Sequence, residues 1–340
     1  MANSGTDVYI AAYDGIARVS RTKLYTADAD LPQLSTSPAK DEQTNVWGVF
    51  TSKEETQLLN PDTGELDILA AGSQRLFGFN ETGLIKGPTG QPMSPSPLWG
   101  PMADQMATTS GVLLEDDGKI QLFYGYYPDA TFYSTEYDST TARFKAPRLH
   151  GSGYETQYPP VPVVYLDAIH LFCLRDSDIR QIDHWRRKPN GDYAEDVPIP
   201  LGSVGAQGMP ATILYQGLLH VLYVTAGSDP DLCLVRFDGK YWSPPLTIAT
   251  HTTTRRPAVA MFNGLLHFLF STARDDGRYQ LGYRSFNGTT LTDTSGGARL
   301  DYPDVAVATR YFRGPEPGTG REVPRELFFL LWRADPTPKG

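Results

Sequence analysis

The sequence predicts an all-β fold: a six-bladed β-propeller whose last blade is closed by strands from both termini. Three observations predict it: a pattern that recurs along the chain, tight turns inside each copy, and complementary half-copies at the two ends. Self-similarity with a period of roughly 20–50 residues is typical of propellers, solenoids and arrays. We therefore expect one propeller domain that spans residues 1–340.

The repeat is clearest in two segments that begin at Pro210 and Pro257. Each starts with Pro-Ala, continues through a strand-forming run to a Gln-Gly or Asn-Gly pair, and then reads Leu-Leu-His. Gly217 of the first copy aligns with Gly264 of the second. Such two-residue turns supply the positive φ angles that tight hairpins require. Short runs of β-branched and aromatic residues on either side predict a four-stranded blade.

Weaker copies precede these two. Their second halves are marked by turns, and the turn positions along the whole chain fall at residues 15, 83, 139, 191, 239 and 288. First halves lie at residues 111–123 and 161–172, and the weakest copy lies at residues 46–50. The gaps between turns shorten along the chain, so the early blades carry the insertions. Counting the copies predicts six blades.

The two ends of the chain carry complementary parts of one blade. Residues 7–18 match the second half of the repeat, while residues 304–309 and 326–332 supply two strands of a first half. We expect residues 1–30 to pair with residues 303–335 in the closing blade. This pairing would close the ring and remove the strand edges that an open ring leaves unpaired.

Composition limits the kinds of partner. Charged residues make up 20% and hydrophobic residues 40%, as in folded globular domains. A net charge of −9 provides no basic surface, so nucleic acid is not an expected partner. No segment is apolar for long enough to predict a membrane span, and no signal peptide is visible. A cytoplasmic location is expected for the chain as given, with a secreted form that has lost its leader as the alternative.

The cysteines and histidines predict structural roles. Cys173 and Cys233 lie in apolar runs and are expected to be buried free thiols. His170, His220 and His267 occupy equivalent positions in successive blades, so rotation around the ring keeps them from meeting at one metal ion. A repeated hydrogen bond within each blade is expected instead. The other histidines show no ligand-like spacing: His150, His184 and His251. Neither a metal nor a cofactor is therefore predicted.

Ligand binding is expected at the end of the ring that carries the variable loops. In a blade, the loops between the second and third strands and the crossovers lie at one end, and the tight hairpins lie at the other. Loops held by a rigid scaffold commonly carry binding residues. The candidate ligand-binding residues on these loops are arginines, acids and one tyrosine: Arg255, Arg256, Arg274, Asp275, Asp176, Glu155 and Tyr158.

Arg255 and Arg256 are the leading candidates because they directly precede the inner strand that begins at Pro257. That position brings them towards the central channel, where the electrostatic field concentrates and could hold an anionic or polyhydroxyl ligand. Aromatic rings pack on the C–H patches of sugars, and charged groups form forked hydrogen bonds to hydroxyls. A glycan or another small polar molecule is therefore the expected ligand. The alternative is that these arginines only neutralise nearby acids.

The repeat resembles the blades of sialidase-like and lectin-like β-propellers in its Pro-Ala start, its Leu-His pair and the Asp238-Gly239 turn followed by Trp242. The six-fold count with terminal closure is similar to that of the six-bladed fucose-binding lectins. Arg236 stands where the sialidase turn has Ser, and one residue of that turn is absent. The arginine triad of sialidases cannot be assigned residue by residue, and no Arg–Glu–aromatic trio like that of the fucose lectins recurs in register. No family residue is therefore transferred to this chain.

Two functions are predicted. The first is a non-catalytic, lectin-like carbohydrate-binding propeller, which the symmetric repeat and the lack of a recognised catalytic motif favour. The alternative is a glycoside hydrolase, sialidase-like or of another propeller type, with two carboxylates about 5–9 Å apart at the ring axis. A scaffold for protein interaction is a third possibility. The acids whose loops could reach the axis are Asp129, Glu155, Asp176, Asp229 and Asp275.

Two observations would discriminate between the lectin and the enzyme. Ligand contacts repeated blade by blade would favour the lectin, whereas one central pocket with perturbed acids would favour the enzyme. Trp242 has two possible roles: its ring could bind a sugar, or it could pack in the core. Strand alternation sends one of Tyr241 and Trp242 towards the neighbouring blade and leaves the other at the surface, and we expect Trp242 to be the structural one.

Overall fold

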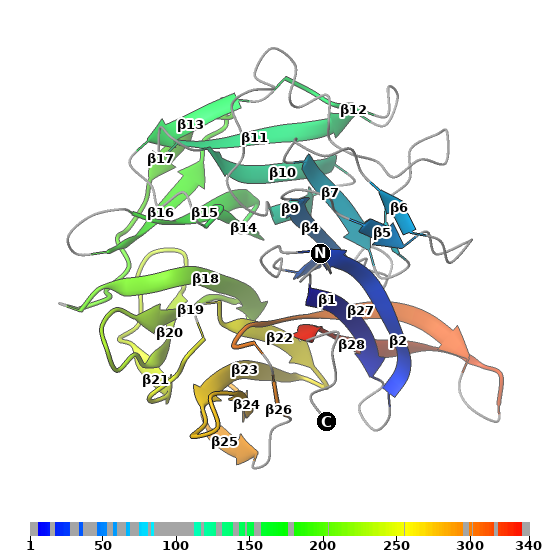
Figure 1. Ribbon diagram of the computed structural model, residues 1–340. Helices are drawn as coiled ribbons and strands as arrows, with labels where there is room; N and C mark the ends of the chain where they lie inside the picture. The colour runs from blue at the N-terminus through cyan, green and yellow to red at the C-terminus, as the bar shows by residue number, and fades with distance from the viewer. Residues whose placement is uncertain are drawn as a thin grey trace.

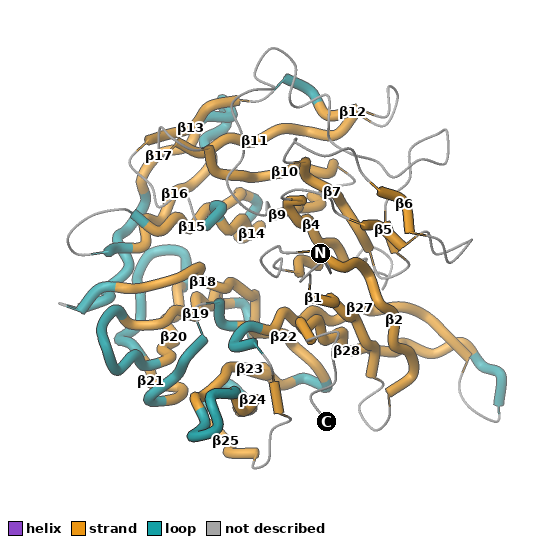
Figure 2. Tube along the Cα trace, viewed as in Figure 1, coloured by secondary structure: helices purple, strands orange, loops and turns teal. Residues whose placement is uncertain are grey.

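The computed structural model describes most of the chain between residues 6 and 334. Outside the described set are residues 1–5, 14–17, 28–33, 37–45, 53–56, 60–65, 69–74, 81–82, 85–111, 117–118, 127–130, 139–142, 147, 153–157, 176–179, 203, 255, 295–298, 301, 316–318 and 335–340. The described residues form strands, turns and loops without any helix, which confirms the predicted all-β class (Figure 2). Within this part of the chain there is accordingly no helix with the length and apolar character needed to span a membrane.

The described strands form six antiparallel sheets that follow one another around a central region (Figure 1). Sheet 1 joins both ends of the chain in the order β27-β28-β1-β2-β5-β6. Its strands are β27 (Val305–Pro315), β28 (Glu322–Ala334), β1 (Thr6–Tyr13), β2 (Arg18–Ala27), β5 (Gln57–Leu59) and β6 (Leu66–Ile68). Strand β1 pairs with β28, from Asp7 opposite Ala334 to Tyr13 opposite Phe328.

The other sheets follow the four-strand repeat, and we number them in chain order. Sheet 2 contains β3 (Leu34–Thr36), β4 (Val46–Ser52), β7 (Arg75–Asn80) and β8 (Gly83–Leu84). Sheet 3 contains β9 (Val112–Asp116), β10 (Lys119–Tyr126), β11 (Thr131–Asp138) and β12 (Arg143–Phe144), with β13 (Arg148–Ser152) also paired to β11. Sheet 4 contains β14 (Val161–Tyr165), β15 (Ala168–Leu174), β16 (Ile182–Arg187) and β17 (Tyr193–Glu195).

The last two sheets contain the two clearest copies of the repeat. Sheet 5 contains β18 (Ala206–Tyr215), β19 (Leu218–Thr225), β20 (Leu232–Phe237) and β21 (Leu246–Ala249). Sheet 6 contains β22 (Ala258–Phe262), β23 (Leu265–Ala273), β24 (Tyr279–Phe286) and β25 (Leu291–Thr294), with β26 (Arg299–Leu300) also paired to β24. The first strands of the six sheets contact one another in the cyclic order β3, β9, β14, β18, β22, β27 and back to β3.

The first hairpins turn as the sequence predicts. In sheet 5, Gln216 and Gly217 have φ angles of 51° and 76°, and in sheet 6, Asn263 and Gly264 have φ angles of 50° and 73°. Positive φ at both central residues matches the right-handed twist of the flanking strands. Sheet 4 makes the same turn without glycine.

Apolar cores lie between successive sheets. One combines Phe172 of sheet 4 with Val221 and Phe237 of sheet 5, and the next combines Leu222 of sheet 5 with Phe268 of sheet 6. Both cysteines are buried free thiols, as predicted, and burial raises the pKa of each.

A hydrogen bond recurs at two of these interfaces. The hydroxyl of Tyr165, at the end of β14, donates to the carbonyl of Gly217 in the next sheet at 3.2 Å. The hydroxyl of Tyr215, at the end of β18, donates to the carbonyl of Gly264 at 2.9 Å. The sequence repeat is thus also a repeat of contacts between sheets.

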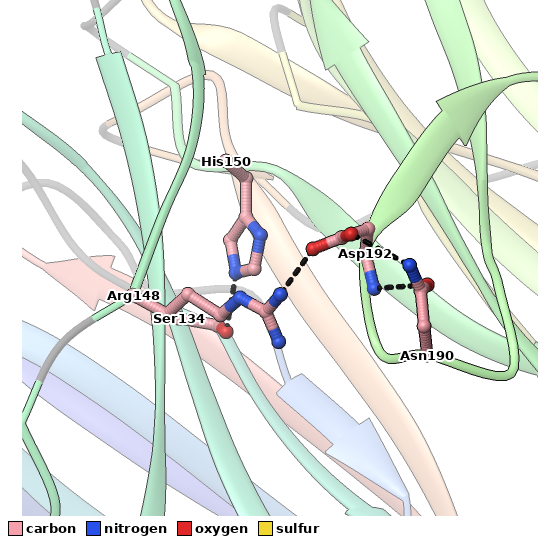
Figure 3. A network of polar contacts seen from close by, with 5 residues as sticks. All are labelled: Ser134, Arg148, His150, Asn190 and Asp192. Carbon is pink, nitrogen blue, oxygen red and sulfur yellow. Dashed lines mark hydrogen bonds and ion pairs between the residues drawn. The ribbon is translucent and has the colours of Figure 1, made fainter.

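The interface between sheets 3 and 4 carries a network of polar contacts at its rim (Figure 3). Arg148 of β13 forms an ion pair with Asp192, which lies in the turn before β17. The side-chain amide of Asn190 holds the same carboxylate at 2.8 Å. His150 contacts the Ser134 hydroxyl at 2.6 Å within sheet 3.

Candidate functional site

The crossovers and the loops between second and third strands meet at one end of the described sheets. The backbone N–H of Ala206, at the start of β18, donates to the carbonyl of Arg180 in the loop before β16 at 2.7 Å. Likewise, Thr252 in the crossover before β22 donates to the carbonyl of Pro230 at 2.9 Å. Gly205 is required here, because a Cβ at this position would lie 2.5 Å from the Arg180 carbonyl oxygen. These bonds fix the crossovers against neighbouring loops.

Buried hydroxyl groups anchor the crossover that leads to β22. The Thr254 hydroxyl lies 3.0 Å from the Ser271 hydroxyl and accepts the Ser271 backbone N–H at 2.7 Å. The Thr252 hydroxyl donates to the Ser271 carbonyl at 2.9 Å. All three side chains are buried, so these bonds hold the chain firmly at the position from which Arg256 extends.

Three half-buried residues then come together at this end, and we call them the first-strand cluster: Tyr158, Arg256 and Asp304. The guanidinium carbon of Arg256 lies 5.4 Å from the centre of the Tyr158 ring, within cation–π distance. The backbone N–H of Arg256 donates to Oδ1 of Asp304 at 3.3 Å. Each residue precedes the first strand of a different sheet: β14, β22 and β27.

The cluster combines the groups that recognise a polyhydroxyl ligand. Tyr158 offers an aromatic face that also packs against the core between sheets 4 and 5. Arg256 offers a planar set of N–H donors, and Asp304 offers carboxylate oxygens as acceptors. Aromatic faces pack on the C–H side of sugars, while arginine and carboxylate groups bond to neighbouring hydroxyls.

The structure brings two of the predicted ligand-binding residues together, Arg256 and Tyr158. Arg274 is placed differently: its side chain pairs with Asp276 at 3.4 Å, and Arg299 pairs with the same carboxylate at 2.9 Å. The charge of Arg274 is thus paired with a neighbouring acid in the same loop. Asp275 is exposed in the same turn. The remaining predicted residues lie outside the described part of the chain: Arg255, Asp176 and Glu155.

Of the acids considered for catalysis, the described part of the chain contains Asp229 and Asp275. Asp229 is exposed and pairs with His251. Burial raises the pKa of Asp183 on β16, although the Arg175 guanidinium at 2.8 Å opposes the shift. This ion pair lies within sheet 4, and we assign it to the fold. Asp129 lies outside the described residues.

Asp304 is the member of the cluster that the sequence did not single out. Its position in the sequence could have identified it, because Asp304 directly precedes the first strand of its sheet, as the Arg255-Arg256 pair precedes β22. Equivalent positions in successive repeats approach one another at the centre of a ring. An acid at such a position is therefore a better candidate than an acid in an outer loop.

Neither a protein-family model nor a curated protein sequence matches the chain. A solved protein of unknown function from Dyadobacter fermentans aligns with 92% of this chain and 98% of its own, at 10% identity and a TM-score of 0.50. An endo-arabinase from Bacteroides thetaiotaomicron aligns with 65% of this chain and 93% of its own, at 13% identity and a TM-score of 0.43.

The family 117 glycoside hydrolase Zg3597 from the marine bacterium Zobellia galactanivorans aligns with 67% of this chain and 83% of its own, at 14% identity and a TM-score of 0.42. These structures do not confirm the sialidase-like or lectin-like resemblance of the repeat. At such identities the likeness concerns the fold alone.

Proposed function

We propose that the six sheets are the blades of one closed propeller, a single domain that spans residues 1–340. Two observations support this proposal: the cyclic contacts between first strands, and the pairing of β1 with β28, which puts both ends of the chain in one sheet. A closed ring has no exposed sheet edges at its two ends and gives its first strands a common axis. The first-strand cluster would then lie at the mouth of that axis.

We propose further that the protein binds a carbohydrate at this mouth. The observation that carries the proposal is the Arg256 guanidinium over the Tyr158 ring, with Asp304 beside it. A sugar ring would pack on an aromatic face while its hydroxyls bond to the guanidinium and the carboxylate. Arg255, adjacent in the chain to Arg256, and Asp176 remain proposed contributors from the same end.

The asymmetry of the cluster favours a glycoside hydrolase over a non-catalytic lectin. A tyrosine, an arginine and an aspartate precede first strands in three different sheets, so among the described residues these contacts occur once and are not repeated from sheet to sheet. A lectin built on the repeat would carry similar contacts in several blades. We therefore put the hydrolase first and keep the lectin-like binding protein as the second candidate.

The proposed chemistry requires two carboxyl groups. One protonates the glycosidic oxygen as it leaves, and the other activates water or attacks the anomeric carbon. Asp304 is proposed for the second role. Glu155, three residues before Tyr158 in the chain, is proposed as the acid. Arg256 and Tyr158 would contact the same sugar and orient it towards the two carboxyl groups.

The test combines a binding screen with a product assay. The protein is applied to a glycan array and incubated with neutral and acidic polysaccharides, and new reducing ends are measured. We expect Asp304→Asn to lower the rate of release by roughly 100-fold or more while binding persists. Arg256→Ala should weaken binding by roughly tenfold or more, because it removes forked, charge-assisted hydrogen bonds.

Arg274→Ala is the matched control, because it removes the same charge from the same end of the molecule but from a local ion pair with Asp276. It should leave binding and release unchanged. Binding without release would establish the lectin-like function and reject the hydrolase. If Arg256→Ala keeps the full binding and release of the parent, the site lies elsewhere.

A further inference from the structure

Two buried histidines of sheet 4 lie against each other, away from the first-strand cluster. His170 of β15 and His184 of β16 are 1% and 2% exposed, and Nδ1 of His170 lies 2.8 Å from Nε2 of His184. The rings of Phe172 and Trp242 pack against His184, with centroids 4.8 Å and 5.4 Å away. The pair is thus enclosed between sheets 4 and 5.

The outer nitrogens of both rings face backbone carbonyl groups. Nε2 of His170 lies 3.2 Å from the Tyr165 oxygen, and Nδ1 of His184 lies 3.3 Å from the Val197 oxygen. Because a carbonyl only accepts, each outer nitrogen must carry the proton. A neutral imidazole has one proton, so the two inner nitrogens present lone pairs to each other.

This arrangement is the one expected of metal-binding histidines. A ligating imidazole typically donates its remaining N–H to a backbone carbonyl or a carboxylate, which fixes the tautomer and aims the lone pair at the ion. Here both rings are fixed in this way. Without a cation, two lone pairs at 2.8 Å repel each other, so the pair needs a positive charge between or beside the inner nitrogens.

Asp196 completes the group. One ligand atom from each of His170, His184 and Asp196 lies within 4.8 Å of the other two. Oδ1 of Asp196 accepts the Val197 backbone N–H at 2.8 Å. Its Oδ2 is buried and has no hydrogen-bond partner among the described residues. A buried carboxylate oxygen without a partner is costly, and a cation would satisfy it.

Asp196 also opens the group to solvent. It lines a surface cavity of about 670 Å³ on the hairpin end of sheet 4, together with Leu166 and Asp167 of one hairpin and Arg186 and Lys188 of the other. An ion could enter through this cavity. Arg186 is exposed, so water and salt screen its charge.

We propose that His170, His184 and Asp196 bind one divalent metal ion, with Zn²⁺ as the best match. Two imidazole nitrogens and one carboxylate suit Zn²⁺, and three protein ligands leave a fourth position for water from the cavity. The inner nitrogens must move apart from 2.8 Å to roughly 3.3 Å, since a tetrahedral ion holds each at about 2.0–2.1 Å. The carbohydrate site is not involved.

Metal binding to the full chain tests the proposal. The metal-stripped protein is dialysed against Zn²⁺, and bound metal is measured by elemental analysis. Co²⁺ is titrated in parallel and followed by its visible absorption. We expect one ion per chain in the parent and a melting temperature that rises with Zn²⁺. Asp196→Asn and His184→Gln should each weaken binding by more than roughly tenfold.

His220→Gln is the matched control. His220 is the equivalent of His170 in sheet 5, is also buried, and has a ring nitrogen 3.2 Å from a backbone carbonyl. It should leave metal binding unchanged. If His184→Gln does not fold, the half-buried Asp196→Asn variant still decides. A parent that binds no metal would leave a histidine pair that only shares a proton and overturn the proposal, as would equal binding by both ligand variants.

Discussion

The same position of the repeat has a different chemistry in sheets 4, 5 and 6. The second strand of each sheet carries an equivalent buried histidine: His170, His220 and His267. Two residues after this histidine, the second strand pairs with a third-strand residue that differs in each sheet. These third-strand residues are His184, Leu234 and Tyr283. The backbone frame is therefore kept while one neighbouring side chain changes.

That single change decides what each histidine contacts. His170 meets the ring nitrogen of His184, whereas His267 contacts the Tyr283 hydroxyl. The predicted bond within the blade is confirmed for His170 and His267, whose Nε2 atoms face the carbonyl that ends the first strand. His220 has an apolar neighbour and turns its Nδ1 to the Leu218 carbonyl. Shared contacts build the scaffold, and the residues that differ between sheets are where site chemistry can arise.

The largest expected effect comes from removing the ring that joins sheets 4 and 5. Trp242 stacks on Phe237 with centroids 4.7 Å apart and donates its indole N–H to the Val197 carbonyl at 3.0 Å. Trp242→Ala should lower the free energy of unfolding by about 3 kcal/mol or more, as large core truncations do. Urea unfolding followed by circular dichroism measures this.

Tyr241→Ala is the control for that variant. Tyr241 is 62% exposed, so removal of its ring should change the free energy of unfolding by less than about 0.5 kcal/mol. The predicted division between the two rings is confirmed by these contacts. If Trp242→Ala kept its stability and lost glycan binding, the tryptophan would be a sugar platform after all.

Much of the fold was predictable because it repeats. The Gln216-Gly217 and Asn263-Gly264 pairs specify tight turns by local backbone chemistry, and the strands around them follow. The outer hairpin β5–β6 was not predicted, because it lies in a long insertion where no copy of the repeat gives a reference. The extra strands β13 and β26 were missed for the same reason: each adds to a third strand outside the four-strand pattern.

The sites were predictable only in part, because they depend on contacts between sheets. Arg256 could be chosen as a candidate ligand-binding residue because it lies just before a first strand. Tyr158 could be chosen because it lies in a crossover loop. The contact between His170 and His184 depends on the register of β15 on β16, where His170 lies opposite Arg186. The length of the intervening loop sets that register, and no repeated pattern specifies it. Spacing along the chain therefore gave no sign of the histidine pair.

A smaller expected effect is the contribution of His220, in sheet 5, to the pH dependence of the free energy of unfolding. Burial, with a further contribution from the charge of Arg236, lowers the pKa of His220 to about 4. A base whose folded pKa is lowered stabilises the fold fully above its unfolded pKa of about 6.5 and loses that contribution as the pH falls towards 4. Replacing His220 by Gln should flatten this part of the stability curve.

The measurement is urea unfolding of the parent and His220→Gln between pH 7.5 and pH 4. The difference in unfolding free energy between the two proteins should shrink steadily as the pH falls, because only the parent has a ring that gains a proton on unfolding. A difference that stays constant over this range would show that the pKa of His220 is the same in the folded and unfolded states, and would contradict the prediction.

The smallest expected effect tests whether repeated contacts have equal strength. Tyr165 and Tyr215 make the same hydroxyl-to-carbonyl bond across successive interfaces, whereas sheet 6 has Phe262 at this position. Tyr165→Phe and Tyr215→Phe should each lower the free energy of unfolding by about 1 kcal/mol, the usual net value of a hydrogen bond. Tyr241→Phe, in an exposed ring, should have no effect. Phe262 already lacks the hydroxyl, so the fold tolerates the absence of this bond in sheet 6. If either Tyr→Phe variant lowered the free energy of unfolding by well above about 3 kcal/mol, these bonds would do more than support the packing of neighbouring sheets.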